Sequence, residues 1–242
     1  MKTWVPGGIS DPVLVAESLL VFEKDFILFR VRSCVSSDRF DCEVMDWDLF
    51  YRLSKAVARK IKDSKYNPDF IVGLARGGWV LARVLCDLLG VKDLVSLKVE
   101  HWGVTATPDG KAKIKYPFQL DLTGRRILLV DDITDTGESM MLALDYVKNL
   151  NPSEVRTATL RHIIGSKFTP DYFGDEITWR WVIFPWNYVE DMCNILPRVV
   201  SKCKNLREIR ETLKKDFKIE VEEEEISDVL NELRDRSRGG LL

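Results

Sequence analysis

The sequence predicts an α/β protein with a mostly parallel, five-stranded sheet that has helices on both faces, plus a small C-terminal helical module. Short runs of branched apolar residues alternate with segments of helical periodicity, which indicates strands buried between layers of helices. Two of these runs end in turns rich in glycine or acidic residues. Ligands bind at the carboxyl ends of the strands in such sheets, so these turns are the candidate site.

Composition narrows the possible functions. The chain has 242 residues and a formal net charge of −2, so it lacks the basic surface expected of a nucleic-acid-binding protein. No apolar run reaches membrane-spanning length, and the five scattered cysteines form no CxxC pair. We therefore expect no nucleic-acid partner, no membrane partner, no zinc site, and reduced thiols in the cytoplasm.

The N-terminal part of the sequence is the hardest to place. Residues 1–44 are apolar in places without one clean period, so they form either an added strand and helix or upstream sequence from an early start codon. A helix is predicted from Trp47, with apolar residues four apart, and it ends before Asn67-Pro68. We place the main domain at residues 45–187.

The first central strand is predicted at Asp69–Leu74 and ends in the loop Ala75-Arg76-Gly77-Gly78. An Arg among small residues lets backbone amides approach an oxyanion while the guanidinium binds it. The same Arg-Gly-Gly sequence is compatible with an ordinary turn that exposes its Arg, or with a nucleic-acid contact. The loop alone does not decide between these interpretations.

A strand is predicted at Leu94–Val99, followed by a polar loop over residues 101–116. The length of this loop and its lack of an apolar face indicate a cover over a site rather than packed structure. Three of its lysines could reach an anion there, although lysines in loops are more often only solvated. They are Lys111, Lys113 and Lys115.

The strand Arg126–Val130 leads into two adjacent carboxylates, Asp131 and Asp132, and then into the turn Asp135-Thr136-Gly137-Glu138-Ser139. A helix follows, and its free N–H groups and positive dipole end suit a phosphate. The two carboxylates lie about a sugar's length away, where they can accept hydrogen bonds from ribose hydroxyls or hold a hydrated Mg²⁺. A solvated acidic turn would explain the acidic residues but not the complete pattern.

A further strand is predicted at Val155–Leu160, and the chain later carries the aromatic segment Trp181-Val182-Ile183-Phe184-Pro185-Trp186. Residues 188–242 then carry two apolar helical stripes and form the C-terminal helical module. Packing, a dimer contact and partner binding are all open as its role, and packing is the most common for such stripes. The stripes are Leu206, Ile209, Leu213 and Phe217, and Ile226, Val229, Leu230 and Leu233.

The segment Arg126–Ser139 resembles the PRPP-binding signature of type I phosphoribosyltransferases: an apolar strand, two acidic residues, two further residues, and Asp-Thr-Gly. The resemblance covers about residues 45–187 and implies that family's fold. It implies that Asp135–Ser139 binds the 5-phosphate of PRPP, and that Asp131 and Asp132 hold its ribose and, through water, Mg²⁺. It also implies that Asp135 faces N7 of the base as the catalytic acid/base.

By the same resemblance, Ala75-Arg76-Gly77-Gly78 binds the pyrophosphate of PRPP, with a non-proline cis peptide at Ala75–Arg76, and the loop 101–116 is the lid that excludes water. The segment Trp181–Trp186 resembles the base-binding segment of 6-oxopurine phosphoribosyltransferases. This second likeness implies that Trp181 stacks on the purine while the backbone of Val182 reads its edge. A last strand with aromatic core packing is the alternative.

One departure from the family pattern bears on the base. The 6-oxopurine enzymes usually carry a Lys-Pro pair, whose Lys donates to O6, where this chain has Ile163-Ile164. Without that donor an O6 acceptor would be poorly satisfied, whereas an exocyclic amino group would lose nothing. We therefore favour adenine, with hypoxanthine, guanine and xanthine as rivals, because His162 or Arg161 could replace the donor.

The sequence thus predicts a purine phosphoribosyltransferase that transfers ribose 5-phosphate from PRPP to a purine base, releases pyrophosphate, and uses Mg²⁺. The resemblance implies a homodimer and a place in purine salvage. The alternative from another class is a regulator that senses PRPP without catalysis, since a fold alone does not establish an activity. A transferase that uses a pyrimidine or orotate is a further alternative, which the Trp181 segment disfavours.

Overall fold

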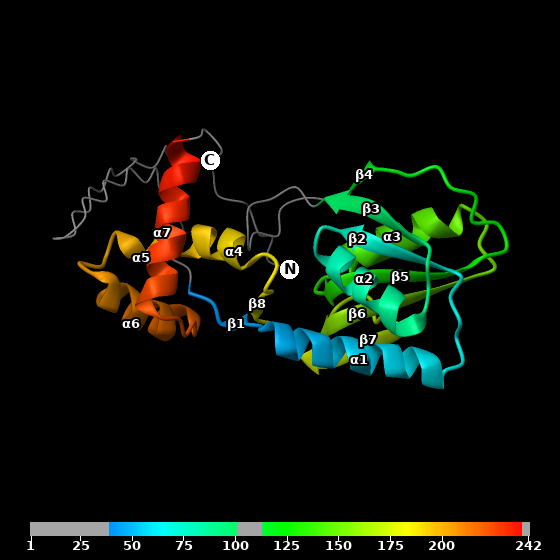
Figure 1. Ribbon diagram of the computed structural model, residues 1–242, viewed down its shortest axis with the longest axis horizontal. Coiled ribbons are helices and arrows are strands. Elements are labelled where there is room, and N and C mark those ends of the chain that lie inside the picture. The colour runs from blue at the N-terminus through cyan, green and yellow to red at the C-terminus, as the bar shows by residue number, and fades with distance from the viewer. Residues whose placement is uncertain (1–38, 101–112, 239–242) are drawn as a thin grey trace, which may run out of the picture. The chain divides into compact units, whose positions relative to one another are not determined.

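The computed structural model describes residues 39–100 and 113–238. Contacts divide the described residues into two compact units, one of residues 41–188 and one that joins residues 39–40 to residues 189–238. The first unit is the α/β part (Figure 1). Its elements are β1 (Cys42–Val44), α1 (Trp47–Asp63), β2 (Phe70–Ala75), α2 (Gly77–Leu89), β3 (Leu94–Glu100), β4 (Lys113–Tyr116), β5 (Arg126–Thr134), α3 (Glu138–Lys148), β6 (Glu154–Ile163), β7 (Tyr172–Ile177) and β8 (Trp181–Ile183).

The main sheet has six strands in the order β4-β3-β2-β5-β6-β7. Five of them are parallel, as predicted, and β4 adds an antiparallel strand at the edge beside β3. Strand β4 replaces the end of the predicted loop, so the expectation of irregular structure was wrong for Lys113–Tyr116. Residues 101–112 of that loop lie outside the described part of the chain.

Two details of the strands differ from the prediction. Strand β7 is the fifth parallel strand, although the sequence analysis assigned no strand there. The segment Trp181–Trp186, for which a last strand was the alternative to a base-binding role, begins with strand β8, which pairs in parallel with β1 in a separate two-stranded sheet. We call this pair the β1–β8 ribbon. Because β1 comes from the last residues of the predicted extension 1–44, those residues are part of the α/β unit.

Helices cover both faces of the sheet, as the apolar runs predicted. Helices α1 and α2 pack on one face in a core with Leu128, Val130 and Leu160. Helix α3 packs on the other face, where Leu129 and Met140 lie in the second core. The sheet is buried between these layers, which leaves the turns at the strand ends as the positions free to bind a ligand.

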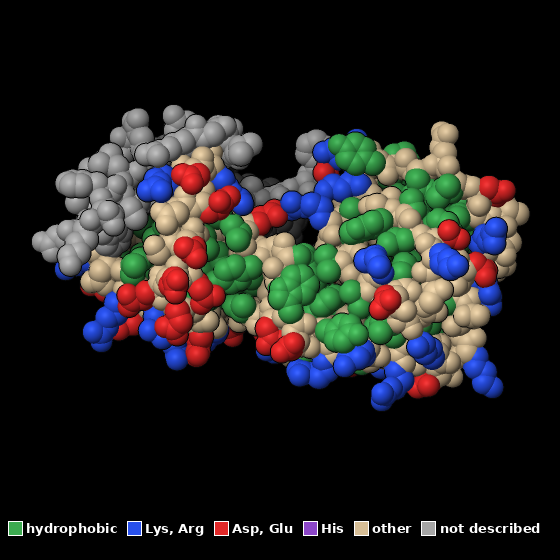
Figure 2. Space-filling view, viewed as in Figure 1, with side chains coloured by type: hydrophobic (Ala, Val, Ile, Leu, Met, Phe, Trp, Pro, Cys, Tyr) green, Lys and Arg blue, Asp and Glu red, His purple; other side chains and the backbone are tan. Residues whose placement is uncertain are grey.

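Helix α1 has a capped N-terminus and one apolar face that packs on the sheet. Its Asp46 side chain caps the first turn by accepting a hydrogen bond from the N–H of Leu49 at 2.6 Å. Its apolar stripe is buried, including Val57 and Ile61, both fully. The opposite face carries Lys and Arg side chains along its length (Figure 2).

The second unit contains α4 (Tyr188–Ile195), which starts at the last residue of the first unit, α5 (Pro197–Val200), α6 (Leu206–Phe217) and α7 (Glu223–Arg238). Both predicted apolar stripes face inward: Leu206 is partly buried and the other seven residues are buried. The ring of Phe40 packs edge-on against Phe217 at 5.1 Å. Within residues 39–100 and 113–238, no helix combines the length and apolarity needed to span a membrane.

Candidate functional site

The loop after β2 meets the acidic pair after β5. The two strands are parallel neighbours, with Gly73 opposite Val130, so their carboxyl ends lie side by side. A Cβ atom on Gly78 would lie 2.6 Å from Cα of Asp131 and 2.7 Å from O of Val130. Only glycine fits there, because a Cβ would overlap backbone atoms. The peptide bond Ala75–Arg76 is cis, as the sequence analysis predicted.

The acidic pair itself is partly buried at the end of β5. Each carboxylate accepts a hydrogen bond from the next N–H: Asp131 from Asp132 at 2.9 Å, and Asp132 from Ile133 at 2.9 Å. Burial and the adjacent charge of Asp132 raise the pKa of Asp131 well above its usual range. Burial also raises the pKa of Asp132. Two adjacent, partly buried carboxylates repel each other when both are ionised. A bound cation would relieve this repulsion and could bridge the carboxylates to a ligand.

These two carboxylates fit the Mg²⁺ that the resemblance implies. Mg²⁺ is usually held by one or two carboxylates together with water and substrate oxygens, and not by a complete protein cage. The described residues contain no cluster of three or more His, Cys, Asp or Glu side chains able to hold a metal. Asp131 and Asp132 are therefore the residues that would hold the ion, through water and with the substrate.

The turn after β5 forms the start of α3. Gly137 precedes the helix with φ +86°, a conformation that favours glycine, and the hydroxyl of Thr136 accepts a hydrogen bond from the N–H of Glu138 at 3.3 Å. Asp135 and Thr136 are exposed, while Ser139 is partly buried. The N-terminal turn of a helix can bind an anion, because its first N–H groups have no partner within the helix, and the hydroxyl of Thr136 is a further possible donor.

A second wall of this turn comes from the loop between β6 and β7, to which the sequence analysis assigned no binding role. The N–H of Lys167 donates to O of Thr136 at 3.3 Å, and Nζ of Lys167 lies 3.3 Å from Oε1 of Glu138. A Cβ on Gly137 would lie 2.6 Å from Cβ of Phe168. Sequence spacing gave no signal for this contact, because the loops are joined only through the fold.

The predicted base-binding residues lie on the β1–β8 ribbon. Trp181 is partly buried, and its backbone N–H donates a hydrogen bond to O of Asp41 at 2.9 Å. Val182 is buried in the core that contains the apolar face of α1. Figure 1 shows the ribbon on the side of the sheet to which the arrowheads of β6 and β7 point. The rings of Phe184 and Trp186 stack at 4.8 Å, and Trp186 also packs edge-on against Phe50 at 5.1 Å. Trp186 is thus partly buried against the core around α1.

The residues that replace the family's Lys-Pro pair end β6. Ile163 is buried and Ile164 is exposed. Of the two proposed replacement donors, Arg161 is occupied: its Nη1 lies 2.7 Å from Oε1 of Glu43 and its Nε 3.2 Å from Oδ1 of Asp175. His162 is also buried, and its ring lies 5.3 Å from the ring of Phe173.

Two of the three lysines of the predicted lid can be placed. Lys113 and Lys115 lie on β4, and Lys111 falls outside the described residues. Nζ of Lys115 lies 3.0 Å from Oε1 of Glu100, and the bond to Glu100 raises the pKa of this exposed lysine. Lys115 is thus already paired with an acidic side chain.

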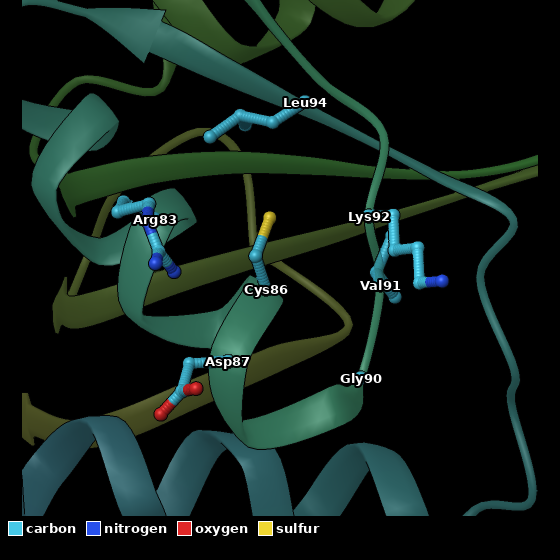
Figure 3. A pocket seen from close by; sticks show the side chains of 7 residues that line it. All are labelled: Arg83, Cys86, Asp87, Gly90, Val91, Lys92 and Leu94. Carbon is cyan, nitrogen blue, oxygen red and sulfur yellow. The ribbon is translucent and has the colours of Figure 1, made fainter.

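A pocket of about 480 Å³ lies elsewhere in the α/β unit (Figure 3). It is formed by the end of α2 and the start of β3, which places it at the amino end of β3, away from the turns described above. None of the predicted site residues line it. The lining residues are Arg83, Cys86, Asp87, Gly90, Val91, Lys92 and Leu94.

Comparison with known proteins gives several relatives. The chain is 30% identical over 158 residues to a xanthine-guanine phosphoribosyltransferase of Cereibacter sphaeroides, covering 60% of this chain and 89% of the relative. It is 28% identical over 142 residues to a hypoxanthine-guanine phosphoribosyltransferase of Aquifex aeolicus, covering 54% and 78%. The matched part is thus a little over half of this chain and most of each relative.

A solved structure gives the same result. The crystal structure of a purine phosphoribosyltransferase from Pyrococcus horikoshii matches with a TM-score of 0.54 and 32% identity, over 60% of this chain and 93% of that one. The family described as "Phosphoribosyl transferase domain" matches residues 43–191, which include the glycine loop, the acidic pair, the helix turn and all of the β1–β8 ribbon except Cys42. This chain therefore belongs to the phosphoribosyl transferase domain family.

Proposed function

We propose that this protein is a purine phosphoribosyltransferase, which transfers ribose 5-phosphate from PRPP to a purine base and releases pyrophosphate. The observation that carries the proposal is the close approach of the glycine loop to the acidic pair at the ends of β2 and β5. An anion-binding loop on one side and a helix start on the other, with two carboxylates between them, match the two phosphate ends and the sugar of PRPP.

Each group of residues then has one task. Arg76 and the backbone of Gly77 and Gly78 bind the pyrophosphate, and the N–H groups of residues 136–139 bind the 5-phosphate. Asp131 and Asp132 orient the ribose hydroxyls. Mg²⁺, when bound, neutralises the charge of the leaving pyrophosphate. Catalysis then rests mainly on positioning and on stabilisation of charge as the bond from C1 of the ribose to the pyrophosphate breaks.

Asp135 is the proposed acid/base. It is exposed at the start of the turn, where it can exchange a proton with N7 of a bound purine. Trp181 stacks on the base and the backbone of Val182 reads its edge, and their place on the ribbon supports that role. The base thus sits between the ribbon and the helix turn.

For the base we favour adenine. Ile163 offers no donor for O6, and the ion pairs of Arg161 leave it poorly suited to replace one. A 6-oxopurine is the second candidate, because the relatives of this chain are named for xanthine, guanine and hypoxanthine. Turnover of adenine, hypoxanthine, guanine and xanthine at fixed PRPP decides between them, and a clear preference for an oxopurine ends the adenine proposal.

The test of the function itself is release of pyrophosphate from PRPP in the presence of Mg²⁺ and each purine. Release that depends on both PRPP and a purine supports the transferase. PRPP binding without release with any of the four purines supports the non-catalytic regulator instead. We also propose a homodimer, which the resemblance implies, and a reducing cytoplasm, which the scattered cysteines of the sequence favour.

A further inference from the structure

A charge network centred on one buried arginine joins the β1–β8 ribbon to the main sheet. Arg161 on β6 is at its centre, with only 4% of its side chain exposed. Its guanidinium lies 2.7 Å from Glu43 on β1 and 3.2 Å from Asp175 on β7. Glu43 in turn lies 3.4 Å from Nη1 of Arg180, the residue before β8. Four charged side chains from four segments therefore meet at one place.

The ribbon needs such a connection. Its two strands pair with each other and form a sheet separate from the six-stranded one. Backbone hydrogen bonds between strands therefore do not fix its position against β6. Apolar contacts of Val182 and Phe184 with the α1 core supply part of the attachment. Apolar contacts are not directional, so they do not fix the position of the ribbon along β6.

Charged groups supply a second constraint: Nη1 and Nε of Arg161 lie at ion-pair distances from two carboxylates, although neither atom is aligned for a hydrogen bond. Arg161 lies opposite Asp175 in the register of β6 and β7, so these two residues are fixed by the sheet itself. Glu43 is fixed by the ribbon, where it lies opposite Val182. A guanidinium held by the sheet and a carboxylate held by the ribbon meet at 2.7 Å, which sets the spacing between the two. A buried arginine left without its carboxylate would be strongly unfavourable, so the spacing resists change.

We propose that Arg161 is a positioning residue for the purine: by binding Glu43 it holds Trp181 and Val182 of the ribbon in register with the end of β6. This inference rests on the proposed function, because it assigns the base to the ribbon. Arg161 itself does not touch the base in this account. It acts through Glu43, whose strand neighbour Val182 reads the edge of the purine.

The first test is steady-state kinetics of the full chain with Arg161→Met, Arg161→Lys and Glu43→Gln. We expect KM for the purine to rise about tenfold in Arg161→Met while KM for PRPP changes by less than about twofold. Arg161→Lys keeps the charge and should recover part of the loss. The matched control is Glu154→Gln, which removes the ion pair with Arg156 (2.6 Å) at the other end of the same strand. Equal rises in both KM values, or the same effect in the control, would overturn the proposal.

The second test does not need activity. In Arg161→Met and Glu43→Gln, hydrogen exchange should accelerate at two backbone N–H groups of the ribbon. These are the N–H of Met45, which donates to O of Ile183, and the N–H of Trp181, which donates to O of Asp41. Exchange in β2 and β5 should stay as in the parent protein. Unchanged exchange at the ribbon refutes the positioning role. If the parent protein shows no transferase activity, the proposed function fails, and the exchange result still decides whether Arg161 holds the ribbon. Glu43→Gln serves if Arg161→Met does not fold.

Discussion

A Cβ atom on Gly77 would lie 1.7 Å from Oδ2 of Asp132, so the loop after β2 and the carboxylate after β5 occupy adjoining space. The two residues are 55 positions apart in the sequence and meet because β2 and β5 are parallel neighbours. In the proposed function, the first binds pyrophosphate and the second binds ribose. The close approach of Gly77 to Asp132 therefore fixes the distance between the pyrophosphate-binding loop and the ribose-binding carboxylate.

Gly77→Ala tests that contact. The added methyl group must displace either the loop or the carboxylate, so we expect kcat/KM for PRPP to fall by about a hundredfold. Gly90→Ala is the control, because Gly90 has a positive φ of 73° and open space around it at the other end of α2. It should cost about 1 kcal/mol of stability and leave KM for PRPP unchanged. Near-normal kinetics in Gly77→Ala would contradict the proposed geometry.

Asp131→Asn tests the raised pKa of the acidic pair. A carboxyl whose pKa is raised in the folded state stabilises the fold at acidic pH, and this contribution is lost as pH rises through the folded-state value. At neutral pH without Mg²⁺ the variant should therefore be more stable than the parent, by about 1 kcal/mol. Asn keeps an oxygen for the N–H of Asp132. Thermal unfolding across weakly acidic to neutral pH measures the effect.

The control for that experiment has the opposite sign. Asp69 accepts hydrogen bonds from the side chain and the backbone of Arg126, which lower its pKa to about 2. Its contribution to stability is present above the ordinary carboxyl range and is lost as pH falls towards about 2. Asp69→Asn should therefore destabilise the protein at neutral pH by about 1 kcal/mol, a figure reduced for solvent screening. If Asp131→Asn destabilised the protein at neutral pH as Asp69→Asn does, the acidic pair would not be destabilising.

Asp135→Asn tests the acid/base assignment. The substitution keeps the size of the side chain and removes its ability to accept a proton, so kcat should fall by about a hundredfold or more. PRPP binding should be unchanged, because the 5-phosphate is bound mainly by backbone N–H groups. Single-turnover kinetics at saturating PRPP separates the two effects. Retention of the parent kcat would remove Asp135 from the mechanism.

Much of this arrangement was readable from the sequence, for a physical reason. The central strands β2 and β5 are buried on both faces and therefore appear as continuous apolar runs, and each ends at a turn whose residues are chemically distinctive. The cis peptide at Ala75–Arg76 and the helix start at Glu138 follow from the family pattern that these turns resemble. The local sequence is sufficient to predict a binding turn where that turn directly follows a buried central strand.

The elements that sequence reasoning missed lie at edges. Strand β7 is an edge strand interrupted by Gly174, Asp175 and Glu176, so it lacks an apolar run. Strand β4 is a four-residue edge strand with two lysines, and β1 has three residues, too few to show a period. The pairing of β1 with β8, and the contact of Lys167 with the helix turn, depend on the fold and leave no pattern in the sequence.

A chain that begins at Met45 tests the role of β1. Such a chain lacks Glu43 and the partner of β8, so we expect the ribbon to lose its order and KM for the purine to rise about tenfold. A chain that begins at Asp41 keeps both and is the control. If the two chains bind the purine equally well, the residues before Met45 have no part in the site.

The account depends most directly on PRPP binding at the acidic pair and the helix turn. The deciding measurement is calorimetric titration of the full chain with PRPP, with and without Mg²⁺, beside the double variant Asp131→Asn/Asp132→Asn. The account predicts saturable binding by the parent protein that is tighter with Mg²⁺ and strongly weakened in the variant. Absence of binding by the parent protein under both conditions, or equal binding by the variant, would contradict it.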